Sequence, residues 1–177
     1  MSSIESDTAD AMRAELARLS ARVATLEDIE AIKKLQARYA AVCDANYNPA
    51  EMVQLFTPDG IWDGGETLGR VQGTDALYRH FESASRQFWW AVHFMIAPSI
   101  EVEDSEATAS GRWYLLEPAT IGATGEVPVE YWLATVYDIT YEKRDGAWLF
   151  QEMKLNPKLW IESGVPWGID GTGGQPG

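Results

Sequence analysis

The sequence predicts an α+β fold in which a cone-shaped, curved antiparallel sheet is wrapped around N-terminal helices. Helical spacing of apolar residues dominates the chain as far as Phe88, and four long strand-like runs follow in hairpin order. Helices followed by consecutive strands are typical of the α+β class. The strands carry tryptophans on both alternations, so we expect the sheet to curl around the helices and leave one open mouth.

The first helical pattern begins at Met12, after a polar stretch (residues 1–10) that we expect to be loose. Apolar residues then recur in the rhythm of a helix-packing seam, at Leu16, Leu19, Val23 and Leu26. This seam fits equally well against a partner subunit or against the chain's own sheet. Thr25 followed by Asp28 resembles a capping box and predicts that the helix restarts there before it ends near Asp44.

Two further helices and a turn are expected before the sheet. Asn48 is a suitable N-cap, with Pro49 at the first helical position. The residues 57–60 predict a turn that leads into a short strand at 61–62. A third helix is indicated by apolar residues that recur at helical spacing, namely Leu77, Phe81, Ala84 and Phe88.

The expected long strands cover residues 90–102, 107–117, 127–141 and 147–155. Asp145-Gly146 indicates a tight hairpin, and Pro157 is expected to end regular pairing because proline has no N–H to donate. The glycine-rich end, residues 171–177, is expected to be disordered. The chain therefore divides into an N-terminal arm or helix (1–24), a barrel domain (25–162) and a C-terminal tail (163–177).

Composition argues against several classes of partner. The 177 residues suit one domain, and a net charge of −13 disfavours nucleic acid and membrane surfaces. The chain has no apolar run long enough to span a membrane and no signal-peptide pattern, which predicts a cytoplasmic protein. Cys43 is the single cysteine, so no disulfide can form within the chain, and no metal-ligand spacing occurs.

The candidate for chemistry is His93, one of only two histidines, because it lies in an otherwise apolar strand-like run. Burial alone would lower its pKa and keep the imidazole neutral near pH 7, which makes it a usable proton acceptor. Asp44 lies at the C-terminal end of a predicted helix, where the negative end of the helix dipole disfavours a carboxylate. We therefore expect this carboxylate to have a hydrogen-bond donor as a partner. We predict that Asp44 orients His93 and that the hydroxyl of Tyr39 donates to a substrate oxygen.

The aromatic residues expected to hold a hydrophobic cyclic substrate are Trp62, Trp89, Trp113 and Tyr131. A carboxylate–imidazole pair beside a phenol suits abstraction of a proton next to a carbonyl, followed by elimination or isomerisation. This chemistry needs no cofactor and no metal.

The chain resembles the SnoaL-like group of the nuclear transport factor 2-like superfamily over residues 25–160. The resemblance rests on four stretches, residues 26–44, 55–62, 111–115 and 137–148. It implies a cystatin-like α+β barrel, often a homodimer or homotrimer. The most similar pattern is that of bile acid 7α-dehydratases, scytalone dehydratase and hexachlorocyclohexane dehydrochlorinase, whose catalytic Asp and His correspond to Asp44 and His93. The bile acid enzymes also have a tyrosine at the position of Tyr39.

Three functions remain open at the level of sequence. The first is a cofactor-independent, dehydratase-like lyase in which His93 is the base. The second is an isomerase or polyketide cyclase in which Asp44 is the base. The third is a non-catalytic ligand-binding or assembly module, suggested by the seam between Leu16 and Leu26.

Overall fold

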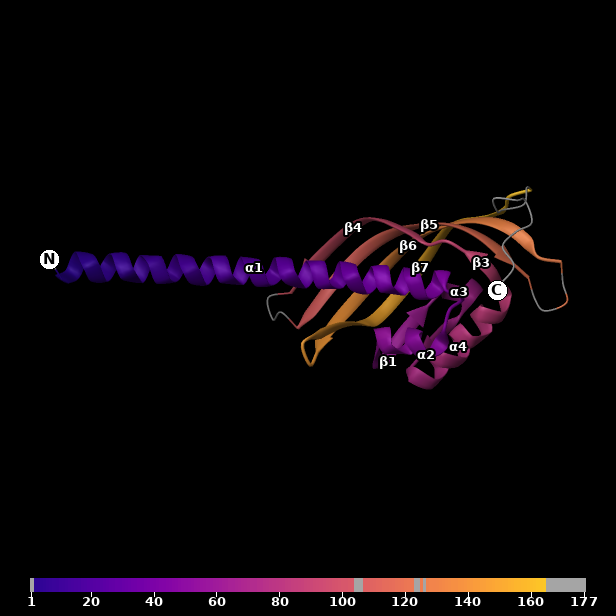
Figure 1. Ribbon diagram of the computed structural model, residues 1–177, viewed down its shortest axis with the longest axis horizontal. Helices are drawn as coiled ribbons and strands as arrows, with labels where there is room; N and C mark the ends of the chain where they lie inside the picture. The colour runs from indigo at the N-terminus through magenta and orange to yellow at the C-terminus, as the bar shows by residue number, and fades with distance from the viewer. Residues whose placement is uncertain (1, 104–106, 123–124, 126, 165–177) are drawn as a thin grey trace.

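The computed structural model describes residues 2–103, 107–122, 125 and 127–164. A long N-terminal helix projects from a curved sheet that is covered on one face by shorter helices (Figure 1). The elements in chain order are α1 (Ser2–Asp44), α2 (Pro49–Met52), the 3-10 turn η1 (Val53–Leu55), β1 (Phe56–Asp63), α3 (Gly65–Leu68), β2 (Arg70–Gln72), α4 (Thr74–Gln87), β3 (Phe88–Ala91), β4 (Phe94–Val102), β5 (Thr108–Ile121), β6 (Val129–Arg144) and β7 (Ala147–Glu162).

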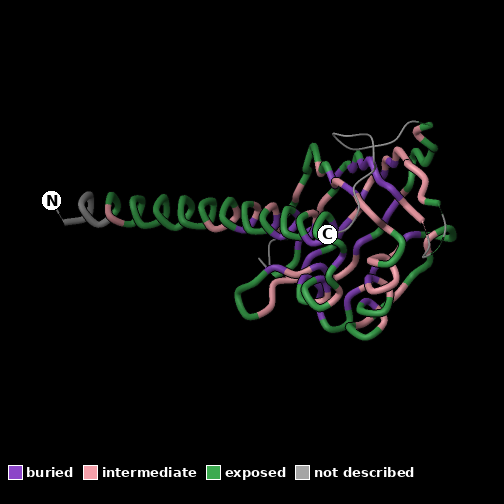
Figure 2. Tube along the Cα trace, turned by 45° about the vertical axis from the view of Figure 1, so that its right-hand side comes forward, coloured by how far each residue is buried: buried purple, intermediate pink, exposed green. Residues whose placement is uncertain are grey.

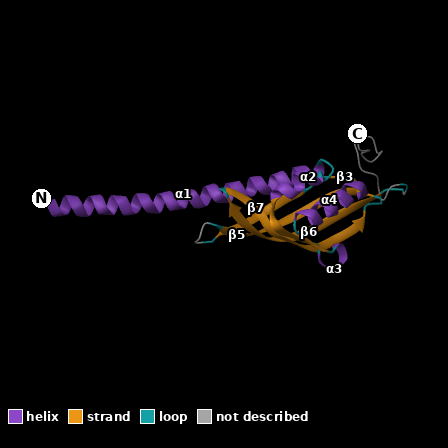
Figure 3. Cartoon of the chain, turned by 90° about the horizontal axis from the view of Figure 1, so that it is seen from below, coloured by secondary structure: helices purple, strands orange, loops and turns teal. Residues whose placement is uncertain are grey.

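The strands form one curved, unclosed sheet in the order β2-β1-β7-β6-β5-β3, and β4 also pairs with β5 (Figure 3). The predicted α+β architecture is confirmed. The sheet is mixed, however, because β1 pairs with β7 in parallel while the other neighbours are antiparallel. The parallel pair arises because the helices between β1 and β3 return the chain to the far edge of the sheet.

The core fills the space between the concave face of this sheet and the helices. On β6 the odd-numbered residues from Leu133 to Tyr141 are buried, so one alternation of the strand faces inward. Ile32 and Leu35 of α1 pack into this core from one side, and Leu77 and Phe81 of α4 pack into it from another. The long strands thus form a shell that positions side chains from distant segments around one interior.

The long helix α1 is continuous, and the predicted restart at Thr25 is wrong. The Thr25 hydroxyl donates to the carbonyl of Ala21 within the helix, and Asp28 is buried against the sheet instead of capping. Asp28 Oδ1 accepts hydrogen bonds from Lys143 Nζ at 2.6 Å and from Trp148 Nε1 at 2.8 Å. Helical backbone also extends through residues 2–10, which were expected to be loose, whereas the predicted end at Asp44 is confirmed.

The run that was expected to be one strand, residues 90–102, is two strands separated by Val92 and His93. Ala91 pairs with Ala119 and Phe94 pairs with Leu116, so the interruption lies opposite Glu117 and Pro118 of β5. A proline cannot donate to a strand ladder, which favours an interruption at this position. The backbone N–H of His93 is thereby released for another acceptor.

Strands β5 and β7 run further than expected because prolines do not end them. Pro118 lies within β5, and Pro157 pairs with Thr135 at a shift in the β6–β7 register. Prolines are tolerated at such bulges and where a strand lacks a second neighbour, and β1 stops pairing with β7 at Lys154. Opposite this bulge Thr135 keeps the inward alternation of β6 and is buried.

The predicted caps and turns are confirmed at two places, but the turn expected at residues 57–60 is wrong, because these residues lie within β1 (Phe56–Asp63). The Asn48 side chain accepts from the backbone N–H of Ala50, with Pro49 opening α2. Asp145 and Gly146 both have positive φ, as a tight hairpin between β6 and β7 requires. Residues 104–105, where the sequence also predicts a turn, and most of the C-terminal tail, including residues 171–177, lie outside the described residues. Among the described helices, none combines the length and the apolar character that crossing a lipid bilayer would need.

Removing the buried carboxylate of Asp28 should destabilise the barrel. Asp28→Ala leaves Lys143 and the Trp148 indole N–H without their acceptor, at an expected cost of about 2–3 kcal/mol in the free energy of unfolding. Glu30→Ala on the same helix removes an exposed pair with Lys33 and should cost less than about 0.5 kcal/mol. Urea unfolding of both variants at one protein concentration compares them, and equal losses would contradict this role.

The contribution of Asp28 to the free energy of unfolding should also depend on pH. Burial raises the pKa of Asp28, but the bonds from Lys143 and Trp148 outweigh it and hold the pKa below 3.8. A carboxyl whose pKa is lower in the folded than in the unfolded protein stabilises the fold at any pH above its unfolded-state pKa. This stabilisation is lost as the pH falls through the folded-state pKa. The gap between Asp28→Ala and the wild type should therefore shrink below pH 3.8.

Candidate functional site

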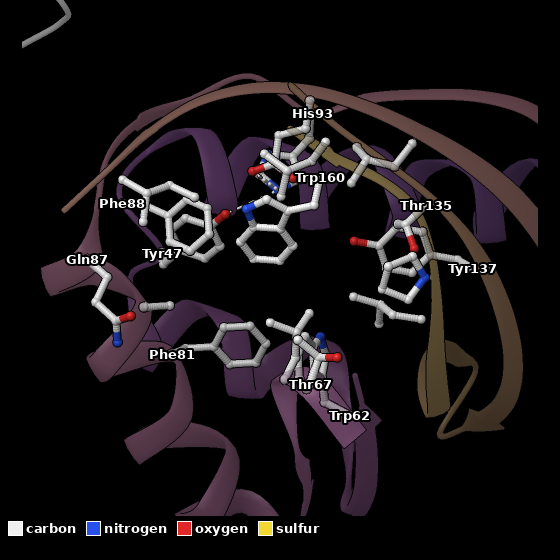
Figure 4. A pocket seen from close by; sticks show the side chains of 18 of the residues that line it. Tyr47, Trp62, Thr67, Phe81, Gln87, Phe88, His93, Thr135, Tyr137 and Trp160 are labelled. Atoms are coloured by element: carbon white, nitrogen blue, oxygen red, sulfur yellow. Dashed lines mark hydrogen bonds and ion pairs between the residues drawn. The ribbon is translucent and has the colours of Figure 1, made fainter. Parts of the chain in front are cut away.

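A cavity of about 440 Å³ lies between the concave face of the sheet and α4. Its walls come from α1, α3, α4 and from strands β1, β5, β6 and β7, and most of the lining is apolar. Figure 4 shows His93 at the top of the cavity and Tyr47 beside Phe88 on one side, with Thr135 and Tyr137 on the other side and Trp62 and Phe81 below. An aliphatic and aromatic lining with few polar groups is typical of a site for a hydrophobic small molecule.

Asp44 and His93 meet, although 48 residues separate them in the chain. Asp44 Oδ1 accepts the backbone N–H of His93 at 2.9 Å and the ring Nδ1–H at 2.8 Å. The first bond uses the N–H that the interruption between β3 and β4 releases. The second bond fixes the ring proton on Nδ1, which leaves Nε2 to face the cavity. The donor that Asp44 needs at the end of α1 is thus His93.

A second tyrosine, Tyr47, provides the phenol next to His93. The Tyr47 hydroxyl lies 3.2 Å from His93 Nε2, and the two rings meet edge to face. Tyr47 and the preceding Asn46 both have positive φ, in a turn closed by a 2.9 Å bond from Tyr47 N to the carbonyl of Val42. This conformation costs a bulky residue about 1–2 kcal/mol, and such strain concentrates at functional sites.

Glu117 places a buried carboxyl on the cavity side of the same imidazole. Its Oε1 lies 3.6 Å from His93 Nε2, and the residue is only 4% exposed. Within the described part of the chain, Glu117 Oε1 has no hydrogen-bond partner. His93 therefore lies between two carboxyl groups, with Asp44 at Nδ1 and Glu117 at Nε2.

These neighbours change the protonation of the site from what burial alone would give. Burial lowers the pKa of His93, but Cys43, Glu117 and Asp44 raise it, and the net pKa lies well above 6.5. Burial does lower the pKa of His93, as expected, but the effects of Cys43, the buried Glu117 and the more exposed Asp44 outweigh it, so the imidazole is not kept neutral by burial. Burial, together with the charge of Asp44, raises the pKa of Glu117 above 4.5 against the opposing effects of His93 and a Tyr47 hydrogen bond. Both shifts favour the protonated forms, and because the two groups are close together they titrate as a coupled pair.

Tyr39 lines the cavity, but it lies beside Tyr137 and Phe150, not beside His93. Burial raises the pKa of both the Tyr39 and the Tyr137 hydroxyl well above 10, so each keeps its proton. Thr135 adds a third hydroxyl to the lining, and its Oγ1 has no hydrogen-bond partner among the residues described. These groups form a second polar region within an otherwise apolar wall.

Of the four aromatic residues expected to hold substrate, Trp62 lines the cavity and three do not. Trp62 packs on His80, with ring centroids 4.2 Å apart, and both residues belong to the lining. The Trp89 indole N–H donates to the carbonyl of Gly122, and the Trp113 indole N–H donates to the buried Tyr141 hydroxyl. Tyr131 packs against Trp160, which itself lines the cavity.

Two residues beside His93, Tyr47 and Glu117, were not identified from the sequence. A signal existed for Glu117, because alternation along β5 puts it on the same face as the buried Trp113 and Leu115. Tyr47 gave no comparable signal, since its position depends on the turn that follows α1 and not on any periodic pattern.

Comparison with known proteins gives one family and one fold. A family model described as the SnoaL-like domain matches residues 24–154. The structure is similar to that of a candidate scytalone dehydratase from Novosphingobium aromaticivorans, with a TM-score of 0.70 and 23% identity over 88% of this chain and 96% of that chain. A hexachlorocyclohexane dehydrochlorinase gives a TM-score of 0.69 with 19% identity, over 87% of this chain and 97% of that chain.

A third similar structure is an NTF2-like protein with a cystatin-like fold, also from Novosphingobium aromaticivorans. Its TM-score is 0.58 with 21% identity, over 79% of this chain and 88% of that chain. The fold is therefore that of the nuclear transport factor 2-like superfamily, as the sequence predicted.

The protonation of the two histidines can be measured without a ligand. In an NMR titration His93 should have a pKa above 6.5, and His80, which burial alone affects, should have a pKa below 6.5. Asp44→Asn should lower the pKa of His93, whereas Asp59→Asn, which alters an exposed carboxyl, should leave it unchanged. A His93 that titrates at or below His80 in the wild type would contradict the two-carboxyl arrangement.

Proposed function

This chain belongs to the SnoaL-like domain family, and we propose that it is a dehydratase-like lyase that acts on a hydrophobic cyclic carbonyl compound with protein side chains alone. The observation that carries the proposal is that His93, Tyr47 and Glu117 line one cavity, with Asp44 bound to the far side of the His93 ring. It places an oriented imidazole and a buried carboxyl within reach of one bound molecule.

In the proposed reaction, His93 Nε2 takes the proton from the carbon next to the substrate carbonyl. Asp44 holds the Nδ1–H and stabilises the imidazolium that forms. The electron pair of the broken C–H bond forms the new C=C bond. Glu117, whose carboxyl is protonated at this stage, gives its proton to the departing hydroxyl, and the C–O bond breaks to release water.

The site must then return one proton from His93 to Glu117, and Tyr47 is placed to carry it. The Tyr47 hydroxyl lies 3.2 Å from His93 Nε2, and Glu117 Oε1 lies 3.6 Å from the same nitrogen, so the hydroxyl and the carboxyl are neighbours around one ring atom. It accepts the proton from the imidazolium while passing its own proton to the carboxylate. The enzyme is restored without exchange with bulk solvent, since His93 and Glu117 are both buried.

The second polar region supports binding of a substrate oxygen away from His93. We assign to Tyr39 the hydrogen bond to the substrate carbonyl, with Tyr137 and Thr135 as neighbouring hydroxyls. Trp62 and Trp160 offer aromatic surface to the rings of the substrate. A cavity of about 440 Å³ suits a compound with a few fused rings.

The isomerase or cyclase with Asp44 as base has weaker support. Asp44 Oδ1 already accepts two hydrogen bonds from His93, and Asp44 is not part of the cavity lining. A His93 without a carboxylate neighbour would favour the non-catalytic alternative, but two carboxyl groups lie close to its ring.

A panel of cyclic β-hydroxyketones with one to four rings tests the reaction directly. Incubation with the protein should give a product lighter by the mass of one water, detected by mass spectrometry and by absorbance of the conjugated enone. A product of unchanged mass would contradict the lyase and favour the isomerase. Saturable binding with no product from any member of the panel would favour a binding module.

Two substitutions test the proposed roles of His93 as the base and Glu117 as the acid. His93→Gln removes the base, and Glu117→Gln removes the proton donor, so each should lower kcat by about 10²–10⁴-fold. Glu101→Gln, which changes an exposed carboxyl on β4, should keep the wild-type rate. Near-UV circular dichroism checks that all three variants retain the fold, and a folded His93→Gln protein with the wild-type rate would refute the mechanism.

The pH dependence of kcat/KM tests whether His93 and Glu117 share one proton in the active form. The active form needs neutral His93 and protonated Glu117, so wild-type kcat/KM should fall at high pH as the pair loses its proton, with a midpoint above 6.5. In Glu117→Gln the remaining requirement is a neutral imidazole, so the slower rate should rise with pH to a plateau. An alkaline decrease of the same midpoint in Glu117→Gln would contradict the assignment of Glu117 as the acid.

A further inference from the structure

We propose that the part of α1 that projects from the barrel is an interface for a second copy of this chain, formed by two arms that pack antiparallel. The arm is residues 7–27, which lie almost entirely exposed along the projecting helix (Figure 2). This inference is independent of the proposed reaction.

The arm carries an apolar stripe with the spacing of a helix–helix seam. Its members are spaced 4, 3, 4 and 3 residues apart, and each is at least 43% exposed: Met12, Leu16, Leu19, Val23 and Leu26. Alternating steps of three and four residues keep one line of side chains in register with another helix. A single helix without packing is only marginally stable in water, so a stripe of this kind calls for a partner.

The stripe points away from the chain's own barrel. With 3.6 residues per turn, its centre lies about 170° around the helix from the residues of α1 that face the sheet, such as Ile32, Leu35 and Tyr39. The alternative that the seam packs on its own sheet is therefore wrong. Figure 1 shows the arm extending past the barrel, which leaves a second helix room to lie along the stripe.

The charge of the arm permits two copies to approach. The whole chain has a net charge of −13, but residues 7–27 contain four acidic and three basic side chains. The arm is thus close to neutral, whereas the rest of the molecule is strongly acidic. Two copies can meet along their arms with little of the repulsion that other surfaces would impose.

In an antiparallel register, the apolar stripe of one arm packs along its full length against the same stripe of the second copy. It pairs each apolar residue of one arm with an apolar residue of the other, in the layers Ala9–Leu26, Met12–Val23 and Leu16–Leu19. Glu15 then flanks Arg22 of the partner subunit, an attractive contact that occurs twice by symmetry.

The interface lies far from the cavity. Leu26 is 18 residues from Asp44 along a continuous helix, a distance of about 27 Å, and the rest of the stripe is further away. Substitutions in the stripe therefore leave the groups around His93 in place. The two proposals can fail separately.

Matched double substitutions in the full chain test the interface. Leu16→Glu with Leu19→Glu places charge in the seam and should weaken the dimer at least about 100-fold, measured by sedimentation equilibrium. Ala17→Glu with Ala21→Glu adds the same charge on the opposite side of the same arm and should leave dimerisation unchanged. Helicity by circular dichroism should fall on dilution for the wild type and for the alanine-site control.

A further control addresses the outer face of the sheet, which also exposes apolar side chains. Ile96→Glu with Tyr114→Glu changes that face, where each residue is about half exposed, and should leave the arm dimer intact. A wild type that stays monomeric at high concentration would overturn the proposal. So would an assembly that the sheet-face variant abolishes and the seam variant does not.

Disulfide trapping tests the orientation. Met12→Cys protein carrying a removable tag is mixed with untagged Val23→Cys protein and oxidised, while the native Cys43 stays buried. The antiparallel register predicts that the mixed 12–23 disulfide forms in preference to either homodisulfide. Predominant homodisulfides would overturn the antiparallel arrangement.

Discussion

The carboxylate of Asp44 is the constraint on which the site depends. One oxygen, Oδ1, accepts both the backbone N–H and the ring Nδ1–H of His93. The first bond closes the interruption between β3 and β4, where no strand partner is available. The second bond fixes the tautomer and the direction of the imidazole. A single acceptor at the end of α1 thus joins the helix to the sheet and leaves Nε2 facing Tyr47, Glu117 and the cavity.

Much of the architecture could be predicted, because it follows from local patterns. Apolar spacing located the helices, alternation located the long strands, and Asn48-Pro49 and Asp145-Gly146 located turns whose backbone demands are strict. Errors arose where tertiary structure overrides a local rule. Asp28 looked like part of a cap but is the acceptor for Lys143 and Trp148, which come from β6 and β7. Pro157 looked like the end of a strand but lies at a bulge where the missing N–H is tolerated.

Part of the candidate site could also be predicted from local sequence. Asp44 and His93 could be chosen because each residue type is unfavourable in its local setting and needs a partner. Tyr47 could not be chosen, because its hydroxyl reaches His93 only through a turn with two residues at positive φ. Trp89 and Trp113 show the opposite error, since both indoles satisfy their N–H groups away from the cavity. An aromatic residue on the right strand is not enough to line a site.

The position of one proton tests this account most directly. The imidazole ¹⁵N chemical shifts of His93 report which ring nitrogen carries the proton, and the chain has only one other histidine. We expect Nδ1 to remain protonated throughout the pH range in which the protein is folded, and we expect Asp44→Leu to abolish this preference. A neutral His93 that carries its proton on Nε2 in the wild type would contradict the arrangement from which the proposed chemistry is derived.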